Sequence, residues 1–242
     1  MKDTAIEWAD NTINFYVGCT KVSEGCKNCY MYRLEHRWGR DPSKVRKTNW
    51  KTIESNLKNW KPSRIFVNSM SDTFHESLSY EQITEMFHIM LKYPQHQYMI
   101  LTKRSGRAKA IFSKETLPDN FLLGVSVENN NHLDRIDDLL ECDGVYNKFL
   151  SLEPLLGKVT PNRDLSPIKW VIVGGESDQS NPRQMKTEWV AEIFDWCKFF
   201  KIPFFFKQWG GQHKCKCHNA WGCRMYGQQT WDNLPLPRII SH

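Results

Sequence analysis

The stretch FLLGVSVENNNHLDRIDDLLEC, residues 121–142, contains one complete strand–helix unit. Its first seven residues form a nearly continuous apolar run, which is typical of a strand covered on both faces. HLDRIDDLLEC (132–142) then repeats apolar residues at the three- and four-residue spacing of an amphipathic helix. A strand followed directly by such a helix predicts a βα unit in a parallel sheet.

Six further short apolar runs share this character, and each is bounded by polar residues, Gly or Pro. They are TINFYV (12–17), RIFVNSM (64–70), QYMILTK (97–103), KFLSL (148–152), KWVIVGG (169–175) and PFFFKQW (203–209). Helical spacing recurs in YEQITEMFHIMLKY (80–93), which Ser79 is expected to cap, and in TEWVAEIFDWCKFF (187–200). The sequence therefore predicts an α/β fold of about seven parallel strands, in a partial or closed TIM-like (β/α) barrel.

Chain length and composition agree with one globular core. The 242 residues are 40% hydrophobic and 25% charged, which is an ordinary composition. We expect a barrel over residues 1–209, with a long insertion at 18–63, and an irregular Cys- and Trp-rich tail over 210–242. Because no apolar stretch is long enough for a membrane span and MKDTAIEWAD (1–10) lacks a signal-peptide core, we predict a cytoplasmic protein with no membrane partner.

Polar or ionisable residues follow every predicted strand. In parallel α/β folds the carboxyl ends of the strands meet at one edge, where ligands bind. One such residue alone would be an ordinary loop or helix cap, but the recurrence at every strand predicts a polar site. The candidates are Asn68, Ser69, Asp72, Lys103, Ser126, Glu128, Glu153, Gly174, Gly175 and Glu176.

Three of the eight cysteines follow the first predicted strand, in GCTKVSEGCKNCY (18–30). Cys19, Cys26 and Cys29 suit either an iron–sulfur cluster or zinc, because thiolates bind both. Three thiolates on a 4Fe–4S cluster would leave one iron open, and in radical S-adenosylmethionine (SAM) enzymes that iron binds SAM. The usual radical SAM spacing is three residues and then two, whereas this chain has six and then two. Zinc and unliganded thiols therefore remain alternatives.

The resemblance to known proteins extends beyond the cysteines. It is carried by IEWADNTINFYVGCTKVSEGCKNCY (6–30), MSDTFHE (70–76), LTKR (101–104), LGVSVEN (123–129), SLEPLLG (151–157), VIVGGES (171–177) and PFFFKQWGG (203–211). These segments resemble the motifs of a phage- and prophage-associated family of uncharacterised three-cysteine proteins. That family is distantly similar to the radical SAM photolyase-like enzymes, which include spore photoproduct lyase. The resemblance implies reductive SAM cleavage by a 4Fe–4S enzyme with a radical SAM type of barrel, an electron donor and a nucleic-acid substrate.

Roles for the polar residues follow from this implied chemistry. Gly174 and Gly175 would let the backbone approach SAM, since glycine has no Cβ, and Glu176 would receive an amine or a ribose hydroxyl. Asn68, Ser69, Asp72, Ser126 and Glu128 are further candidates for SAM binding. Lys103 and Glu153 are the candidate catalytic residues, acting on the SAM carboxylate, a substrate phosphate or another polar group. Plain turns, helix caps and solvated loops are the alternatives.

A second cysteine group lies in the tail, in HKCKCHNAWGCRMYG (213–227). Cys215, Cys217 and Cys223, together with His218, form a candidate second metal site. Their spacing does not distinguish zinc from a second iron–sulfur cluster. The two isolated cysteines, Cys142 and Cys197, are predicted to be buried structural thiols.

Positive charge is concentrated in residues 33–64, which hold ten Lys or Arg and three Asp or Glu, a local net charge of +7. Trp38, Trp50 and Trp60 lie between these charges, and basic residues with aromatic rings are typical of DNA or RNA binding. Alternatively, the three tryptophans pack the insertion while the charges face water.

Two rival functions fit parts of the pattern. A zinc-bearing nucleic-acid-binding or nuclease-accessory protein would explain the thiols and the charge without SAM. A hydrolase would use Asp72, Glu128, Glu153 and Glu176 to bind a divalent ion. Under any of these functions, a neighbouring protein is a further candidate partner.

Overall fold

The computed structural model describes residues 4, 6–177, 181–211, 225–227 and 229–234. Seven parallel strands form its main sheet, as predicted. They are β1 (Asn11–Ile13), β4 (Arg64–Val67), β5 (Gln97–Thr102), β6 (Phe121–Ser126), β7 (Asn147–Leu152), β8 (Ile168–Gly174) and β9 (Phe204–Gln208). The strands have the same order in the sheet as in the sequence, so each connection leads to the adjacent strand of the sheet.

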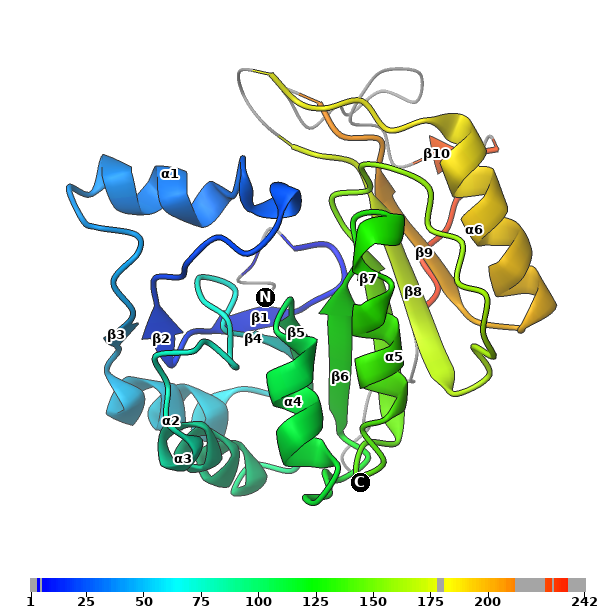
Figure 1. The fold of residues 1–242 in the computed structure, drawn as a ribbon. Helices are drawn as coiled ribbons and strands as arrows, with labels where there is room; N and C mark the ends of the chain where they lie inside the picture. The colour runs from blue at the N-terminus through cyan, green and yellow to red at the C-terminus, as the bar shows by residue number, and fades with distance from the viewer. Residues whose placement is uncertain (1–3, 5, 178–180, 212–224, 228, 235–242) are drawn as a thin grey trace.

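The sheet curls into a half-barrel (Figure 1). The partial barrel is confirmed and the closed barrel is wrong, because no ladder joins β9 to β1 within the described residues. The described end of the tail covers the β9 edge. Trp231 accepts a backbone hydrogen bond from Phe206, and Asp232 forms a bridge with Phe205. Two short strands, β10 (Met225–Tyr226) and β11 (Gln229–Thr230), precede this contact. The tail is therefore more ordered here than predicted, since an uncovered edge would expose unpaired backbone groups.

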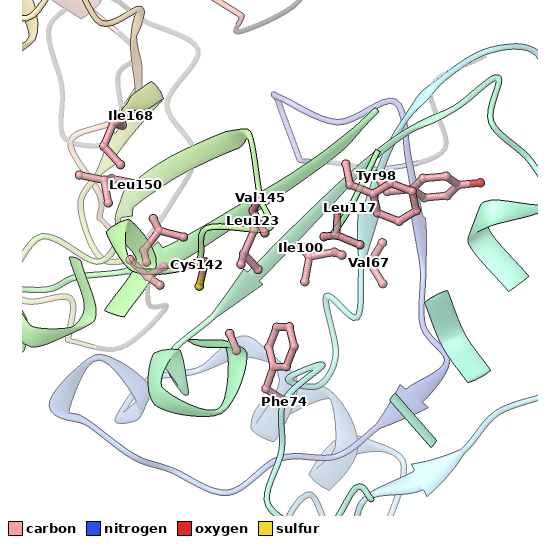
Figure 2. Close-up of a cluster of buried hydrophobic side chains, with 14 of the residues drawn as sticks. Val67, Phe74, Tyr98, Ile100, Leu117, Leu123, Cys142, Val145, Leu150 and Ile168 are labelled. Carbon is pink, nitrogen blue, oxygen red and sulfur yellow. The ribbon is translucent and has the colours of Figure 1, made fainter. Parts of the chain in front are cut away.

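Helices cover the convex face of the sheet, and Figure 1 shows α1 apart from the others. The covering helices are α2 (Trp50–Asn59), α3 (Tyr80–Leu91), α4 (Ser105–Phe112), α5 (Asp134–Leu140) and α6 (Thr187–Phe199). The helical patterns at 80–93, 132–142 and 187–200 are thus confirmed. Ser79 caps α3 in a capping box with Gln82. Figure 2 shows part of the core between these helices and the sheet, where Cys142 is buried as predicted.

The segment predicted as an insertion contains a regular βα unit. α2 buries Trp50, Ile53 and Leu57 at helical spacing and is the crossover helix between β1 and β4. Before it lie a 3₁₀ turn η1 (Glu24–Cys26), α1 (Tyr30–Arg37) and a two-strand ladder of β2 (Tyr16–Val17) with β3 (Arg46–Lys47). Another 3₁₀ turn, η2 (Asn130–His132), precedes α5. Only residues 18–49 therefore form an addition to the barrel pattern.

The concave face of the half-barrel carries its own apolar cluster. Met99, Leu122, Phe149, Trp170 and Phe205 point to this face from neighbouring strands. The N-terminal segment fills the concavity with Trp8, whose ring lies edge-on to Phe66 at 4.7 Å and to Trp170 at 6.0 Å. Because side chains alternate along a strand, Ser151 follows Phe149 on this face, Lys207 follows Phe205, and Ser126 lies four residues beyond Leu122. These three polar residues line the cavity at the carboxyl end of the barrel.

Candidate functional site

A cavity of about 310 Å³ lies at the carboxyl ends of the strands, above Trp8. Its volume is at the lower end of the range of about 300–1,000 Å³ for small-molecule sites. One wall is apolar and consists of Ile6, Trp8, Phe66 and Leu101. The cysteine loop and polar strand ends form the other walls. This combination of an apolar wall with a few directed polar groups is typical of a ligand site.

Most of the predicted site residues line this cavity. They are Cys19, Cys26, Cys29, Asn68, Ser69, Asp72, Lys103, Ser126, Glu153, Gly175 and Glu176. Glu128 and Gly174 lie directly behind it, since a Cβ at Gly25 would overlap the Glu128 carboxylate and one at Gly174 would overlap Glu153. The rule that parallel strand ends form one site therefore places these residues together correctly.

The three cysteines reach the cavity from one loop. Cys19 follows Gly18, which has a φ of 102° and leaves no room for a Cβ beside Lys44. Cys26 ends η1, and Cys29 occupies the N-cap of α1. All three are half-buried free thiols. Burial and the nearby Asp72 raise the pKa of the Cys19 thiol to about 12. Burial also raises the pKa of Cys29, opposed by the Met31 amide at the start of the helix.

The three thiols could hold either a single metal ion or a cluster. Within the described ranges, no three His, Cys, Asp or Glu side chains are placed as ligands of one metal ion. One zinc ion would hold each thiolate at about 2.3 Å, whereas a four-iron cluster is larger and separates its thiolates more widely. The three soft thiols all line one cavity, and thiolates are ligands of both zinc and iron–sulfur clusters.

Arg104 anchors the first cysteine. Its guanidinium donates to Cys19 Sγ at 3.6 Å, to Thr20 Oγ1 at 2.8 Å and to Asp72 Oδ2 at 3.2 Å. Asp72 also accepts from Thr102 Oγ1 at 2.7 Å. We predicted Asp72 as a SAM ligand, but its carboxylate is occupied by protein donors. Asp72 and Arg104 thus connect two strand ends to the cysteine loop.

Glu128 supports the middle of the loop. This buried carboxylate accepts from Ser23 Oγ at 2.7 Å and forms ion pairs with Lys103 at 3.0 Å and with Arg135 at 2.9 Å. Burial disfavours its charge, but the two cations hold its pKa below the usual range. The predicted ligand Glu128 is therefore a support for the loop, while Lys103 still lines the cavity.

Glu176 holds the far end of the loop. Its buried carboxylate accepts from Asn28 Nδ2 at 3.0 Å and from Arg183 Nε at 2.9 Å. Arg183 also donates to the Glu24 carbonyl at 2.9 Å. Burial disfavours the charge, yet Arg183 and Asn28 keep the pKa of Glu176 below its ordinary value. Glu176 reaches the cavity wall with its oxygens already bound to the protein.

Arg183→Ala is expected to lower the free energy of unfolding by about 1–3 kcal/mol at pH 7, since it leaves the buried Glu176 without its cation. The folded-state pKa of Glu176 is depressed, so its contribution is present above the unfolded value near 4.3 and is lost as pH falls through the folded value. The difference between wild type and variant should therefore shrink below about pH 4. Urea unfolding at pH 7, 5 and 3.5 measures it, and a difference independent of pH would contradict this account.

Asn68 and Ser69 hold the backbone beside the cavity. Asn68 has a φ of 56°, accepts from the Phe15 amide at 2.8 Å and donates to Thr73 Oγ1 at 3.0 Å. Ser69 Oγ donates to Asn14 Oδ1 at 3.3 Å, and its carbonyl accepts from the Tyr30 hydroxyl. Asn68 and Ser69 therefore stabilise the turn after β4. This agrees with the alternative in which both are structural residues and not ligands.

The strand ends opposite the cysteines keep accessible polar groups. Glu153 forms an ion pair with Lys207 at 3.2 Å and accepts from Ser151 Oγ at 3.2 Å. Ser126 lines the same wall. Gly175 is required because a Cβ there would overlap the Trp209 carbonyl. Lys207 was not among our predicted site residues, although its two-residue spacing from Phe205 would have placed it on the concave face.

Some predictions fall elsewhere. Cys215, Cys217, Cys223 and His218, the candidate second metal site, lie outside the described residues. Two of the three tryptophans of the basic segment pack inward: Trp50 is buried and donates to the Phe15 carbonyl at 2.8 Å, and Trp60 packs on the core. Cys197 is buried in α6 as predicted. Within the part of the chain that the structure describes, no helix has the length and apolar character for a membrane crossing.

Residues 3–235 match the model of a family described as "Protein of unknown function (DUF5131)". The chain belongs to this family. The match covers the half-barrel, the cysteine loop and the described part of the tail, so the DUF5131 region includes every group that forms the cavity. No curated protein and no solved structure matches the chain. The DUF5131 description names no activity.

Proposed function

We propose that this DUF5131 protein is a radical SAM-type iron–sulfur enzyme whose 4Fe–4S cluster is held by Cys19, Cys26 and Cys29. The observation that carries the proposal is the convergence of three free thiols on a half-barrel cavity that also has polar and apolar walls. The reduced cluster would supply the electron for cleavage of SAM into methionine and a 5′-deoxyadenosyl group. An electron donor is then a required partner, and a cytoplasmic location suits the free thiols.

The chain's own residues would position the reactants. Lys103, Glu153 and Lys207 present charged groups to the cavity and would orient the amino and carboxylate groups of SAM or a polar group of the substrate. The apolar wall at Trp8 and Phe66 would exclude water from the reacting atoms. Arg104, Glu128 and Glu176 each bind the cysteine loop and would keep its thiols in position. A neighbouring partner protein and a DNA or RNA substrate are part of this proposal.

The zinc-protein alternative has less support. It requires a tetrahedral ligand set around one ion, whereas Cys19, Cys26 and Cys29 supply three thiols and no fourth His, Cys, Asp or Glu joins them as a metal group within the described residues. A hydrolase that binds a divalent ion through Asp72, Glu128, Glu153 and Glu176 meets a similar difficulty. The first two and the last of these carboxylates are occupied by Arg104, Arg135 and Arg183, respectively.

Reductive SAM cleavage tests the proposal. Protein purified without oxygen should be brown, and after reduction with dithionite it should convert SAM to 5′-deoxyadenosine and methionine in equal amounts, even without substrate. Chromatography of the products measures both. The matched control is the same preparation without reductant, which should leave SAM intact. A fully clustered, reduced protein that neither binds nor cleaves SAM would overturn the proposal.

A further inference from the structure

A basic surface with one exposed indole ring lies beside the cavity mouth. Helix α1 begins directly after Cys29, and its first residues, Tyr30 and Met31, line the cavity. The helix buries Met31 and Glu35 and turns its other side to solvent. We define the α1 surface as the exposed residues Arg33, His36, Arg37, Trp38, Arg40 and Lys44. Among the described helices, Figure 1 shows none packed alongside α1.

The acids of the same segment, Glu35 and Asp41, neutralise the positive charge of the α1 surface only in part. Glu35 is buried beneath it, where it pairs with Arg46 and lies 4.0 Å from Arg40. Asp41 accepts from the Ser43 amide at 2.9 Å and from its hydroxyl at 2.7 Å. Two arginines thus share the single Glu35 carboxylate, and Arg33, Arg37, Arg40 and Lys44 stay exposed with a surplus of positive charge, which favours a polyanionic ligand.

Trp38 differs from the other two tryptophans of the basic segment. Trp38 is 53% exposed, whereas Trp50 and Trp60 pack on the core. The Arg40 guanidinium lies 5.5 Å from the Trp38 ring centre. An exposed indole flanked by cations provides a stacking platform for a base next to binding sites for phosphates.

We propose that the α1 surface binds single-stranded nucleic acid, with one base stacked on Trp38 and phosphates on Arg33, Arg37 and Arg40. Trp38 is eight residues beyond Tyr30, about 12 Å along a helix, which a few nucleotides of single strand span. A strand held on α1 would thus bring a nearby nucleotide to the cavity. The delivery of a nucleotide to the cavity rests on the proposed function, whereas the binding of a single strand to the α1 surface does not. Single strands are favoured because stacking on Trp38 and entry into the cavity both require an unpaired base.

Fluorescence anisotropy with labelled 12-nucleotide DNA and RNA tests the proposal on the full chain, without SAM or reductant. Wild type should bind single strands more tightly than the same sequences as duplexes, and the DNA and RNA arms identify the preferred polymer. Trp38→Ala should weaken binding about 5- to 150-fold, and Trp38→Phe should restore most of the affinity. With three phosphates engaged, the slope of log affinity against log salt should be about −2 for a single strand.

Tyr146→Ala is the matched control. Tyr146 is 65% exposed and has Lys169 over its ring at 5.1 Å, but it lies at the opposite end of the strands, before β7. This variant should bind like wild type. Equal affinity of Trp38→Ala and wild type, a preference for duplex, or no binding to either polymer at low salt would each overturn the α1 proposal. Binding retained by a protein that fails to cleave SAM would leave the α1 surface standing while the proposed function falls.

Discussion

Replacement of Cys19, Cys26 or Cys29 by Ala is expected to abolish both the iron–sulfur absorbance and reductive SAM cleavage. The three thiols are the proposed cluster ligands, and each lines the cavity from a different part of the loop. With one thiol removed, two remain, too few to hold a four-iron cluster that already leaves one iron open. Iron and sulfide analysis of anaerobic protein measures the loss, which should be about four of each per chain.

The two buried cysteines provide the control for this experiment. Cys142→Ala and Cys197→Ala remove a thiol from the core on the convex side, away from the cavity. They should lower stability slightly and leave iron content and SAM cleavage unchanged. The difference in iron and sulfide content between each variant and wild type reports on the first site alone, whether or not Cys215, Cys217 and Cys223 bind a metal. Unchanged iron and sulfide in the Cys19, Cys26 and Cys29 triple variant would refute the ligand assignment.

The sheet could be predicted from sequence because its strands are buried on both faces. In a chain of ordinary composition, near-continuous apolar runs such as KWVIVGG (169–175) indicate strands that are covered on both faces. α2 was missed, although Trp50, Ile53 and Leu57 have helical spacing, because the surrounding lysines suggested a solvated basic segment. Closure of the barrel could not be predicted, since it depends on whether β9 pairs with β1 and not on the sequence of any single strand.

The site could be predicted only in part, because the partner of each side chain depends on how neighbouring strands pack. Strand ends indicated which side chains gather at the cavity, but not which partner each one meets across neighbouring strands. Asp72, Glu128 and Glu176 resemble ligand residues in the sequence, and the structure pairs them with Arg104, Arg135 and Arg183. A buried carboxylate requires such a partner. Arg135 and Arg183 each lie 7 residues from their carboxylate and Arg104 lies 32 residues from its own, at spacings that no local pattern reveals.

Arg104→Met is expected to lower the free energy of unfolding of the metal-free protein by about 3–5 kcal/mol. The Asp72 and Arg104 side chains are only 7% and 4% exposed, so the variant would leave a buried carboxylate without its cation. Arg104→Lys should lose less, because it keeps the charge but not the several hydrogen bonds of the guanidinium. Cluster content should fall as well, since Thr20 and Cys19 lose their shared donor. Anaerobic urea unfolding and iron analysis measure the two effects separately.

Lys158→Met is the matched control, because it removes an ion pair of similar length from the surface. Lys158 lies 2.8 Å from Glu192, and the two side chains are 58% and 38% exposed. Such a pair contributes about 0–1 kcal/mol. Adding Asp72→Asn to Arg104→Met should recover part of the lost stability, since it removes the unpaired charge. If Arg104→Met were no more destabilising than Lys158→Met, Arg104 could not be the anchor of the cysteine loop, and the Cys19 thiol would have to be held by the Gly18 turn and the hydrogen bond from its own amide to the Pro42 carbonyl at 2.8 Å.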